Sequence, residues 1–306
     1  LLFAFFQAKF AIITPALITG AFAERVRFWA YLLFMVLFIL VVYAPLCHMT
    51  WHPDGLFFKM GVLDFAGGTV VHMSAGWAAL AGAIFLGKRK VQKTNPARIT
   101  YVLLGTGLLW FGWFGFNAGS ELAADGIAAI AFINTLAAPA AAMLGWIIVE
   151  YFKHGKATSI GAGSGAVAGL VAITPACASV SPMYAMLLGV IAGVLCALAV
   201  DLKFSFGFDD SLDVVGIHLV GGIVGTLFIG FFGEGVGAAF GFGWDQLAAQ
   251  AIGAGAVLVY SFVLALLIGF AIDKTIGFRV KAEDEIAGID TVVHGEEAYA
   301  FGADRG

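Results

Sequence analysis

Long apolar runs separated by short polar segments fill the chain from its first residue to about residue 277. Nine of these runs are close to the roughly 17–25 residues that a helix needs to cross a membrane. They cover approximately residues 1–22, 28–47, 65–87, 99–118, 126–152, 159–176, 183–201, 214–232 and 246–273. The pattern predicts an all-α membrane protein, a multi-span helical bundle over residues 1–277 followed by a tail over residues 278–306.

The basic residues indicate how these spans are oriented. If the loop with Arg25 and Arg27 is cytoplasmic, alternation places 14 of the 16 lysines and arginines inside, with Lys9 and Lys59 left outside or at the outer edge. Such a bias sets orientation in membrane proteins. We therefore expect the first span to enter from outside and the charged tail to be cytoplasmic, where it can dock a partner.

Composition supports a membrane location and narrows the chemistry. Apolar residues make up 61% of the 306 and charged residues 12%, against roughly 25% charged in soluble domains. The net charge of −4 argues against a nucleic-acid partner. Cys47, Cys177 and Cys196 are scattered without CxxC spacing, so neither a disulfide framework nor a metal knuckle is indicated. We expect no cofactor.

Two aspartate–histidine units recur within the apolar runs: Asp64 with His72, and Asp210 with His218. Eight helical residues span about 12 Å, close to half of a roughly 30 Å hydrocarbon layer. An aspartate at the interface would therefore place its histidine near the membrane midplane. Because ionisable groups inside a span are costly, they are usually retained for handling substrate, ions or protons.

The surroundings of the two units indicate an internal repeat. Gly76 and Gly222 each lie four residues after a histidine, and small residues, Ala79 and Gly225, lie seven after. The units fall in the third and eighth expected spans, which cross the membrane in opposite directions. This predicts an inverted-topology repeat whose site forms where the two halves meet near the midplane.

Several interpretations of the histidines are open from the residues alone. Each of His72 and His218 can be a core histidine satisfied by the backbone, or one of two imidazoles that line a path and share a proton. A metal site needs three or four ligands, and neither span supplies a cysteine or carboxylate at ligand spacing. The outer loop 47–54 looks metal-like but lacks a second cluster, so we expect no metal.

Aromatic residues near the outer face form a second candidate feature. Trp51 is either an aromatic of the membrane interface or a ring face that recruits a cation. The segment 110–120 ends the fourth expected span with Trp113 and Phe116, which can narrow a pore, and with Asn117 and Ser120, which can form hydrogen bonds. The residues alone do not single out one phenylalanine among 29.

Five strings, within residues 6–25, 64–72, 113–120, 209–218 and 288–299, resemble the ammonium transporter (Amt) family of the Amt/Mep/Rh superfamily. The strings are long, ordered and spread along the chain. The resemblance covers family spans three to eleven, with the first two spans of the ammonium transporter fold missing. Because the chain starts in mid-helix without a methionine, we expect it to be a fragment.

The resemblance implies roles for the outer residues. Trp51, Ser120 and Phe10 would form an ammonium recruitment site, and Phe10 and Phe116 would form a gate beneath it. Trp51 favours the ammonium-transporter branch over the Rhesus-type channels. Lys9 departs from the expected pattern, because a cation beside the gate would repel ammonium unless its side chain extends to the surface.

The resemblance also implies roles deeper in the protein. His72 and His218 would be a hydrogen-bonded pair in the pore, with Asp64 and its counterpart Asp210 as structural or electrostatic support. Leu219, next to His218, is bulkier than the glycine of some members. The family forms homotrimers in the cell membrane with one pore per subunit, and its tail couples subunits and meets a PII-type signal protein.

The functional hypothesis is electrogenic uptake of ammonium, with methylammonium as a further substrate. The cation would be recruited outside and deprotonated, and ammonia would cross a hydrophobic pore while the proton travels by the histidine pair. One alternative is an ammonium sensor with the same fold, and another is a membrane enzyme that uses the histidines on a metal or haem. We expect a transporter and not an enzyme.

Overall fold

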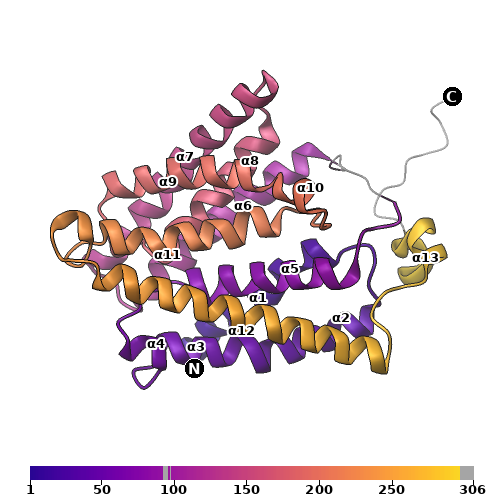
Figure 1. Cartoon of the computed structure of the whole chain (residues 1–306). Coiled ribbons are helices and arrows are strands. Elements are labelled where there is room, and N and C mark those ends of the chain that lie inside the picture. Colours follow the sequence, from indigo (N-terminus) through magenta and orange to yellow (C-terminus); the bar gives the residue numbers. More distant parts are fainter. Residues whose placement is uncertain (92–95, 97, 297–306) are drawn as a thin grey trace.

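The computed structural model is a bundle of long helices that lie roughly side by side (Figure 1). The structure describes residues 1–91, 96 and 98–296. In this part of the chain the regular structure is helical, apart from an isolated antiparallel bridge between Val26 and Arg279. The all-α, multi-span fold predicted from the apolar runs is therefore confirmed.

The first half of the chain forms α1 (Leu2–Phe22), α2 (Phe28–Phe38), η1 (Ile39–Tyr43), α3 (Ala44–Trp51), α4 (Leu56–Lys59), η2 (Gly68–Met73), α5 (Ser74–Leu86), α6 (Ile99–Ala118), η3 (Gly119–Glu121) and α7 (Gly126–His154). The second half forms α8 (Ser159–Ile173), α9 (Pro182–Ala199), α10 (Leu202–Phe206), η4 (Val215–Leu219), α11 (Val220–Phe232), η5 (Ala238–Phe240), α12 (Asp245–Thr275), α13 (Ala282–Ala287) and η6 (Asp290–His294). Among the described residues, eight helices are long and apolar enough to cross a membrane.

The expected span 159–176 is shorter than its apolar run. Helix α8 ends at Ile173 after 15 residues, and a turn follows that contains Pro175, which has no backbone N–H to continue a helix. Asn134 of α7 satisfies this turn, because its amide nitrogen donates to the carbonyls of Cys177 at 2.8 Å and Val180 at 2.7 Å. A buried turn with satisfied carbonyls is tolerated inside a membrane protein.

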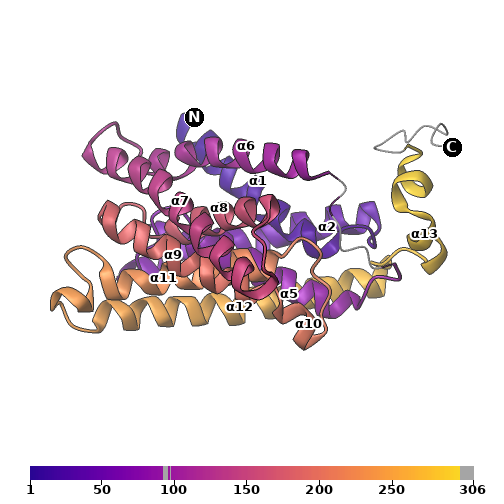
Figure 2. The same cartoon turned by 90° about the horizontal axis from the view of Figure 1, so that it is seen from above.

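Glycines let the helices around α8 approach closely. A Cβ on Gly169 would stand 2.5 Å from the Cα of Pro139 on α7, and one on Gly193 of α9 would stand 2.2 Å from the carbonyl oxygen of Ala142. Small residues at such crossings are typical of membrane helix packing. The glycine-rich stretch after residue 160 therefore serves packing. Helix α6 differs, since Trp113 and Asn117 are its buried residues, and Figure 2 shows α6 at the edge of the bundle, beside α1.

The two aspartate–histidine units pack on each other reciprocally. A Cβ on Gly76 of α5 would stand 2.6 Å from the Cβ of Leu219, and one on Gly222 of α11 would stand 2.9 Å from the Cγ of Met73. Each glycine, four residues after its own histidine, thus faces the residue that follows the other histidine. Two antiparallel copies of one motif produce this symmetry, in agreement with the predicted inverted repeat.

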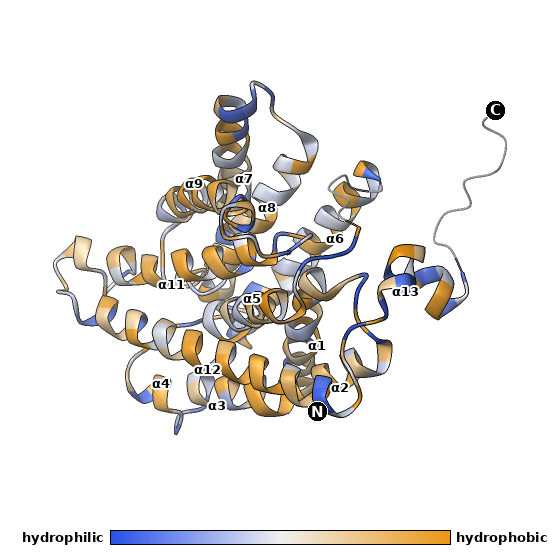
Figure 3. Cartoon of the chain, turned by 45° about the vertical axis from the view of Figure 1, so that its right-hand side comes forward, coloured by the Kyte–Doolittle hydropathy of each residue, from blue (hydrophilic) through white to orange (hydrophobic). Residues whose placement is uncertain are grey.

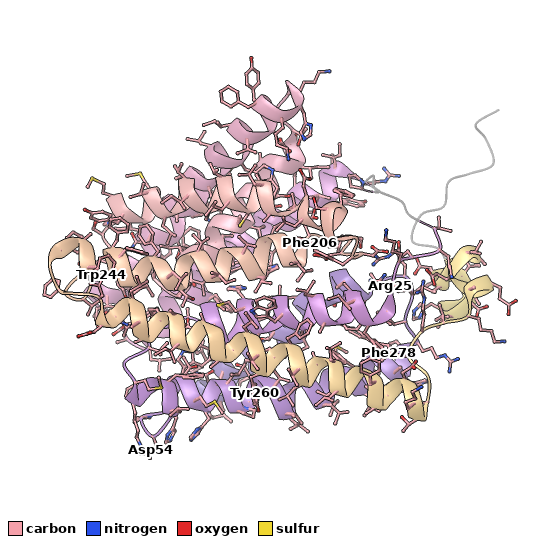
Figure 4. The ribbon with its side chains drawn as sticks, in the orientation of Figure 1. Arg25, Asp54, Phe206, Trp244, Tyr260 and Phe278 are labelled. Carbon is pink, nitrogen blue, oxygen red and sulfur yellow. The ribbon has the colours of Figure 1, made fainter. Side chains whose placement is uncertain are left out.

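The ends of the bundle are distinct. Figure 4 shows Arg25 and Phe278 at one end, near α13, and Asp54 and Trp244 at the opposite end. Polar residues, drawn blue in Figure 3, gather in loops, at helix ends and on α13, whereas the helices are mostly hydrophobic. The loops expected to face the cytoplasm meet at the α13 end, where fully buried Arg25 forms an ion pair with Asp209 at 3.2 Å.

The tail begins as an integral part of this end. Phe278 is fully buried and contacts Phe22 with a centroid distance of 5.6 Å. The guanidinium of Arg279 donates to both carboxylate oxygens of Glu285 at 2.8–2.9 Å, and Glu285 accepts from the backbone nitrogen of Lys90 at 2.7 Å. The expected tail 278–306 is therefore docked on the bundle at its start, while its residues 297–306, like Lys93, lie outside the described residues.

Candidate functional site

An aromatic cavity of about 230 Å³ opens at the end of the bundle opposite the tail. Its walls come from α1, from the end of α3, from the segment before η2 and from the turn after α6. Most of its lining is apolar. Gln7 and Ser120 are the lining residues with polar, non-aromatic side chains. The lining residues are Phe3, Phe6, Gln7, Phe10, Trp51, Phe65, Ser120 and Leu122.

Two stacked rings form the floor of this cavity. Phe10 is buried and stacks on Phe116 of α6, with ring centroids 4.3 Å apart and planes inclined by 30°. Trp51 meets Phe10 edge-on at 5.6 Å. Rings at these separations are in van der Waals contact, so the stack closes the route from the cavity into the bundle in this conformation.

The polar groups at the wall are already oriented. The indole nitrogen of Trp51 donates to the backbone carbonyl of Asp64 at 2.7 Å, so the ring face is what Trp51 presents to a ligand. The hydroxyl of Ser120 donates to the carbonyl of Phe116 at 2.8 Å, which leaves its oxygen lone pairs as acceptors. Both arrangements suit a positively charged ligand with N–H donors.

Beneath the ring stack the two histidines meet. The Nδ1 atoms of His72 and His218 are 3.2 Å apart, and the ring planes are inclined by 19° with centroids 5.3 Å apart. His72 is buried, at 1% exposed, and His218 is half-buried. A hydrogen bond between two Nδ1 atoms requires one ring to donate and the other to accept, so a single proton lies between them.

The histidine pair borders a second cavity of about 430 Å³ between α1 and α6. Apart from the imidazoles and Lys9 its lining is hydrophobic, from Ile12, Ile13, Leu17, Leu108, Leu109, Gly112, Trp113 and Phe116. Lys9, the cation that the sequence placed beside the gate, lines this cavity and is exposed. An apolar space of this kind admits a neutral molecule far more readily than an ion.

Asp64 fixes the start of the helix that carries His72. Its carboxylate accepts hydrogen bonds from the backbone nitrogens of Gly67, Gly68, Thr69 and Val70 at 2.6–3.3 Å and from the Thr69 hydroxyl at 2.5 Å. Residue 67 has φ +110°, a conformation that favours glycine. A carboxylate that closes a helix N-terminus satisfies its free donors, so Asp64 positions the helix without entering the cavity lining.

Asp210 occupies the equivalent place before η4 but is bonded differently. One of its oxygens accepts from the backbone nitrogen of Val215 at 2.8 Å, and the other has no partner within the described residues. Burial raises the pKa of Asp210 to about 6. The nearby Lys203 donates to the Asp210 carbonyl at 3.1 Å and pairs with Asp213. The two repeat aspartates therefore differ in the number of their hydrogen-bond donors.

For Trp113 the sequence predicts only a part in narrowing a pore, and for Gln7 it predicts no role. Trp113 stacks on His72 at 5.4 Å, and its indole nitrogen donates to Thr174 at 2.9 Å. Gln7 lines the outer cavity, and its place one turn before Phe10 is the signal that could have found it. His48, in the last turn of α3, and His52, which follows this helix, stack on each other with centroids 4.6 Å apart. The described residues contain no group of three or more possible metal ligands.

A bundle of membrane-length helices with an apolar cavity beside a pair of imidazoles in contact defines a membrane transporter or channel. The sequence profile of the Ammonium Transporter Family matches residues 1–299, and the chain belongs to this family. The family relation predicted from the five strings is thus confirmed.

Individual relatives agree with this assignment. An ammonium transporter of Mycobacterium tuberculosis is 50% identical, covering 99% of this chain and 69% of the relative, and one of Bacillus subtilis is 46% identical, covering 97% and 76%. The crystal structure of Candida albicans Mep2 has a TM-score of 0.85 at 36% identity, covering 91% of this chain and 66% of that one. A structure titled Sensor Amt Protein has a TM-score of 0.89 at 33% identity, covering 95% and 76%. The chain spans about two thirds of the length of Candida albicans Mep2, both in the structure named above and in that of a mutant form.

Proposed function

We propose that this protein carries ammonium across a cell membrane by separating it into ammonia and a proton. The observation that carries the proposal is the order of features along one path. An aromatic cavity with a hydroxyl acceptor lies above the Phe10–Phe116 stack, and the His72–His218 pair lies below it in an apolar cavity. Family membership supplies the substrate class.

Recruitment is the first step. The face of Trp51 attracts a cation by about 0.5–2 kcal/mol, depending on how far the site is dehydrated. Ser120 accepts one N–H of the ammonium ion, since its own hydrogen is donated to Phe116. The site is uncharged, so it binds the ion weakly enough to release it towards the gate.

Deprotonation follows because a bare cation cannot enter the apolar cavity cheaply. The desolvation cost of an unpaired charge far exceeds what a few contacts return. Ammonium therefore gives up one proton near the gate, and neutral ammonia passes the Phe10–Phe116 stack when the rings move apart. The proton moves along the Nδ1–Nδ1 hydrogen bond of the histidine pair and through water, and it rejoins ammonia inside. The net event is electrogenic.

The test replaces both pore histidines, His72→Leu with His218→Leu, in the complete protein reconstituted in liposomes. We expect the ammonium-driven current to disappear or to lose its selectivity against potassium. A matched control is the double change His48→Leu with His52→Leu, which removes the other stacked pair from the exposed surface at the end of α3. Persistence of the current with unchanged selectivity in the pore variant contradicts the relay role.

Assembly and partners are part of the same proposal. The apolar and largely exposed faces of α6 and α7 fit a homotrimer with one pore per subunit, which native mass spectrometry of the purified protein can count. The docked start of the tail at the basic end of the bundle fits a cytoplasmic C-terminus that meets a PII-type signal protein. Methylammonium fits the outer cavity as a second substrate.

A second function, ammonium sensing without transport, is favoured by the likeness to the Sensor Amt Protein structure. Such a protein binds ammonium in the outer cavity and passes the signal to another domain. Uptake of methylammonium into vesicles separates the two functions. Accumulation supports the transporter, whereas saturable binding without accumulation supports the sensor.

A further inference from the structure

The side-chain amide of Gln7 lines the outer cavity and carries an acceptor that is unused within the described residues. Its oxygen Oε1 is buried and has no hydrogen-bond partner there. A buried acceptor without a partner is destabilising, so such groups in folded proteins generally meet water or a ligand. Gln7 lies on the same helix as Phe10, three residues earlier, and both line the outer cavity.

The other walls leave room for a second acceptor in this cavity. Ser120 offers its lone pairs from the turn after α6, and Gln7 offers its carbonyl oxygen from α1. The indole nitrogen of Trp51 is occupied by the Asp64 carbonyl, so it neither competes for Gln7 nor repels a cation. An ammonium ion has four N–H donors in a tetrahedral arrangement and no acceptor. A cavity with two neutral oxygens and several ring faces matches that pattern.

We propose that the carbonyl oxygen of Gln7 binds ammonium directly, as a second acceptor beside that of Ser120, and thereby sets the affinity of the outer cavity. This inference rests on the proposed function for the identity of the ligand. Because the contact is made before the proton is lost and does not follow the nitrogen past the ring stack, Gln7 contributes to binding and leaves the maximal rate nearly unchanged.

The experiment compares Gln7→Met, which keeps the length of the side chain without its acceptor, with Gln7→Glu, which keeps an acceptor and adds a charge. Ammonium binding is followed by the ligand-dependent rise of the unfolding temperature in detergent, and transport by ammonium-driven current in proteoliposomes. We expect Gln7→Met to raise both the Kd and the KM about tenfold, the effect of one lost hydrogen bond to a charged group. Gln7→Glu should lower both constants below those of the parent.

Gln246→Met is the matched control, because Gln246 donates to the carbonyl of Gly61 at 2.9 Å outside the cavity lining. Unchanged Kd and KM in Gln7→Met, or a weaker affinity in Gln7→Glu, overturns the assignment of Gln7. Binding by the parent without current refutes the transport proposal alone, and Gln7 is then judged on the Kd. A parent that neither binds nor conducts ammonium refutes both.

Discussion

Leu219 lies directly against Gly76, so close that a Cβ on the glycine would stand 2.7 Å from the backbone nitrogen of Leu219. The contact sits four residues from His72 and one from His218, and it sets how near the two repeat helices come. The size of Leu219, unexpected from the family pattern, is accommodated because its partner has no side chain. The distance between the two histidines thus depends on the absence of a side chain at Gly76.

The first prediction concerns Gly76→Ala. The added methyl group meets backbone atoms of Leu219, which cannot move aside as a flexible side chain would, so we expect a loss of about 1–3 kcal/mol of stability. Gly105→Ala on α6 is the control, since no atom lies within 4 Å of that Cβ position. Thermal unfolding in detergent should separate the two variants, and equal stability contradicts the close contact.

The second prediction compares Asp64→Asn with Asp210→Asn. An amide at position 64 faces backbone donors with its own N–H₂ group, and leaving several buried donors unpaired should cost about 3 kcal/mol or more. At position 210 one oxygen suffices for Val215, so at about pH 4, where Asp210 is neutral in the folded protein, the same change should cost about 1 kcal/mol or less. Chemical unfolding of both variants tests this order, and a reversed order contradicts the two hydrogen-bond patterns.

The third prediction is a pH dependence that Asp210 introduces. Its pKa of about 6 in the folded protein is above the value near 3.9 of an unfolded aspartate. The folded state therefore binds this proton more tightly. The associated stability is fully present below about pH 4 and is lost as the pH rises through about 6, by about 3 kcal/mol at most.

The measurement for Asp210 is unfolding of the parent and of Asp210→Asn between about pH 4 and 7. As the pH rises through this range, the free energy of unfolding of the parent should fall by about 3 kcal/mol relative to that of Asp210→Asn. Asp213, whose pKa is also raised by burial, is present in both proteins, so the comparison isolates Asp210. Parallel stability curves would mean that Asp210 is solvated.

The fourth prediction concerns the docked start of the tail. Glu285→Gln removes the charge that holds Arg279 and should lower the free energy of local opening by about 2 kcal/mol. Hydrogen exchange of residues 280–290 should then become markedly faster. Glu283→Gln is the control, because the Glu283 side chain is 77% exposed and its pairing with Lys281 is worth little. Equal exchange in both variants contradicts the anchoring role of Glu285.

Much of the fold could be predicted because its signals are local. Apolar runs of membrane length define helices whatever surrounds them, and all nine expected runs contain one. The equal spacing of Asp64–His72 and Asp210–His218 predicted that the histidines approach from opposite directions, and the structure places them 3.2 Å apart. Their roles in permeation stay predictions until they are measured.

Other features depend on contacts that no local pattern encodes. Both histidines lie in π-helical turns, η2 and η4, which are set by packing of the repeats and are frequent at functional sites. Both carboxylate oxygens of Asp64 accept hydrogen bonds, whereas only one oxygen of Asp210 does. This difference follows from the different loops before the two helices. The hydrogen bond from the Trp51 indole to the Asp64 carbonyl joins residues 13 apart in sequence. No local sequence pattern predicts it.

The early end of α8 has a consequence for His72. The turn that follows brings Pro175 against Gly68, where a Cβ would stand 2.5 Å from the proline ring. It also brings Thr174 to the indole of Trp113, which stacks on His72. If α8 continued as a longer helix, Pro175 would not pack against Gly68 and Thr174 would not accept from the Trp113 indole that stacks on His72. The place where one helix stops thus helps to decide where a proton can be held.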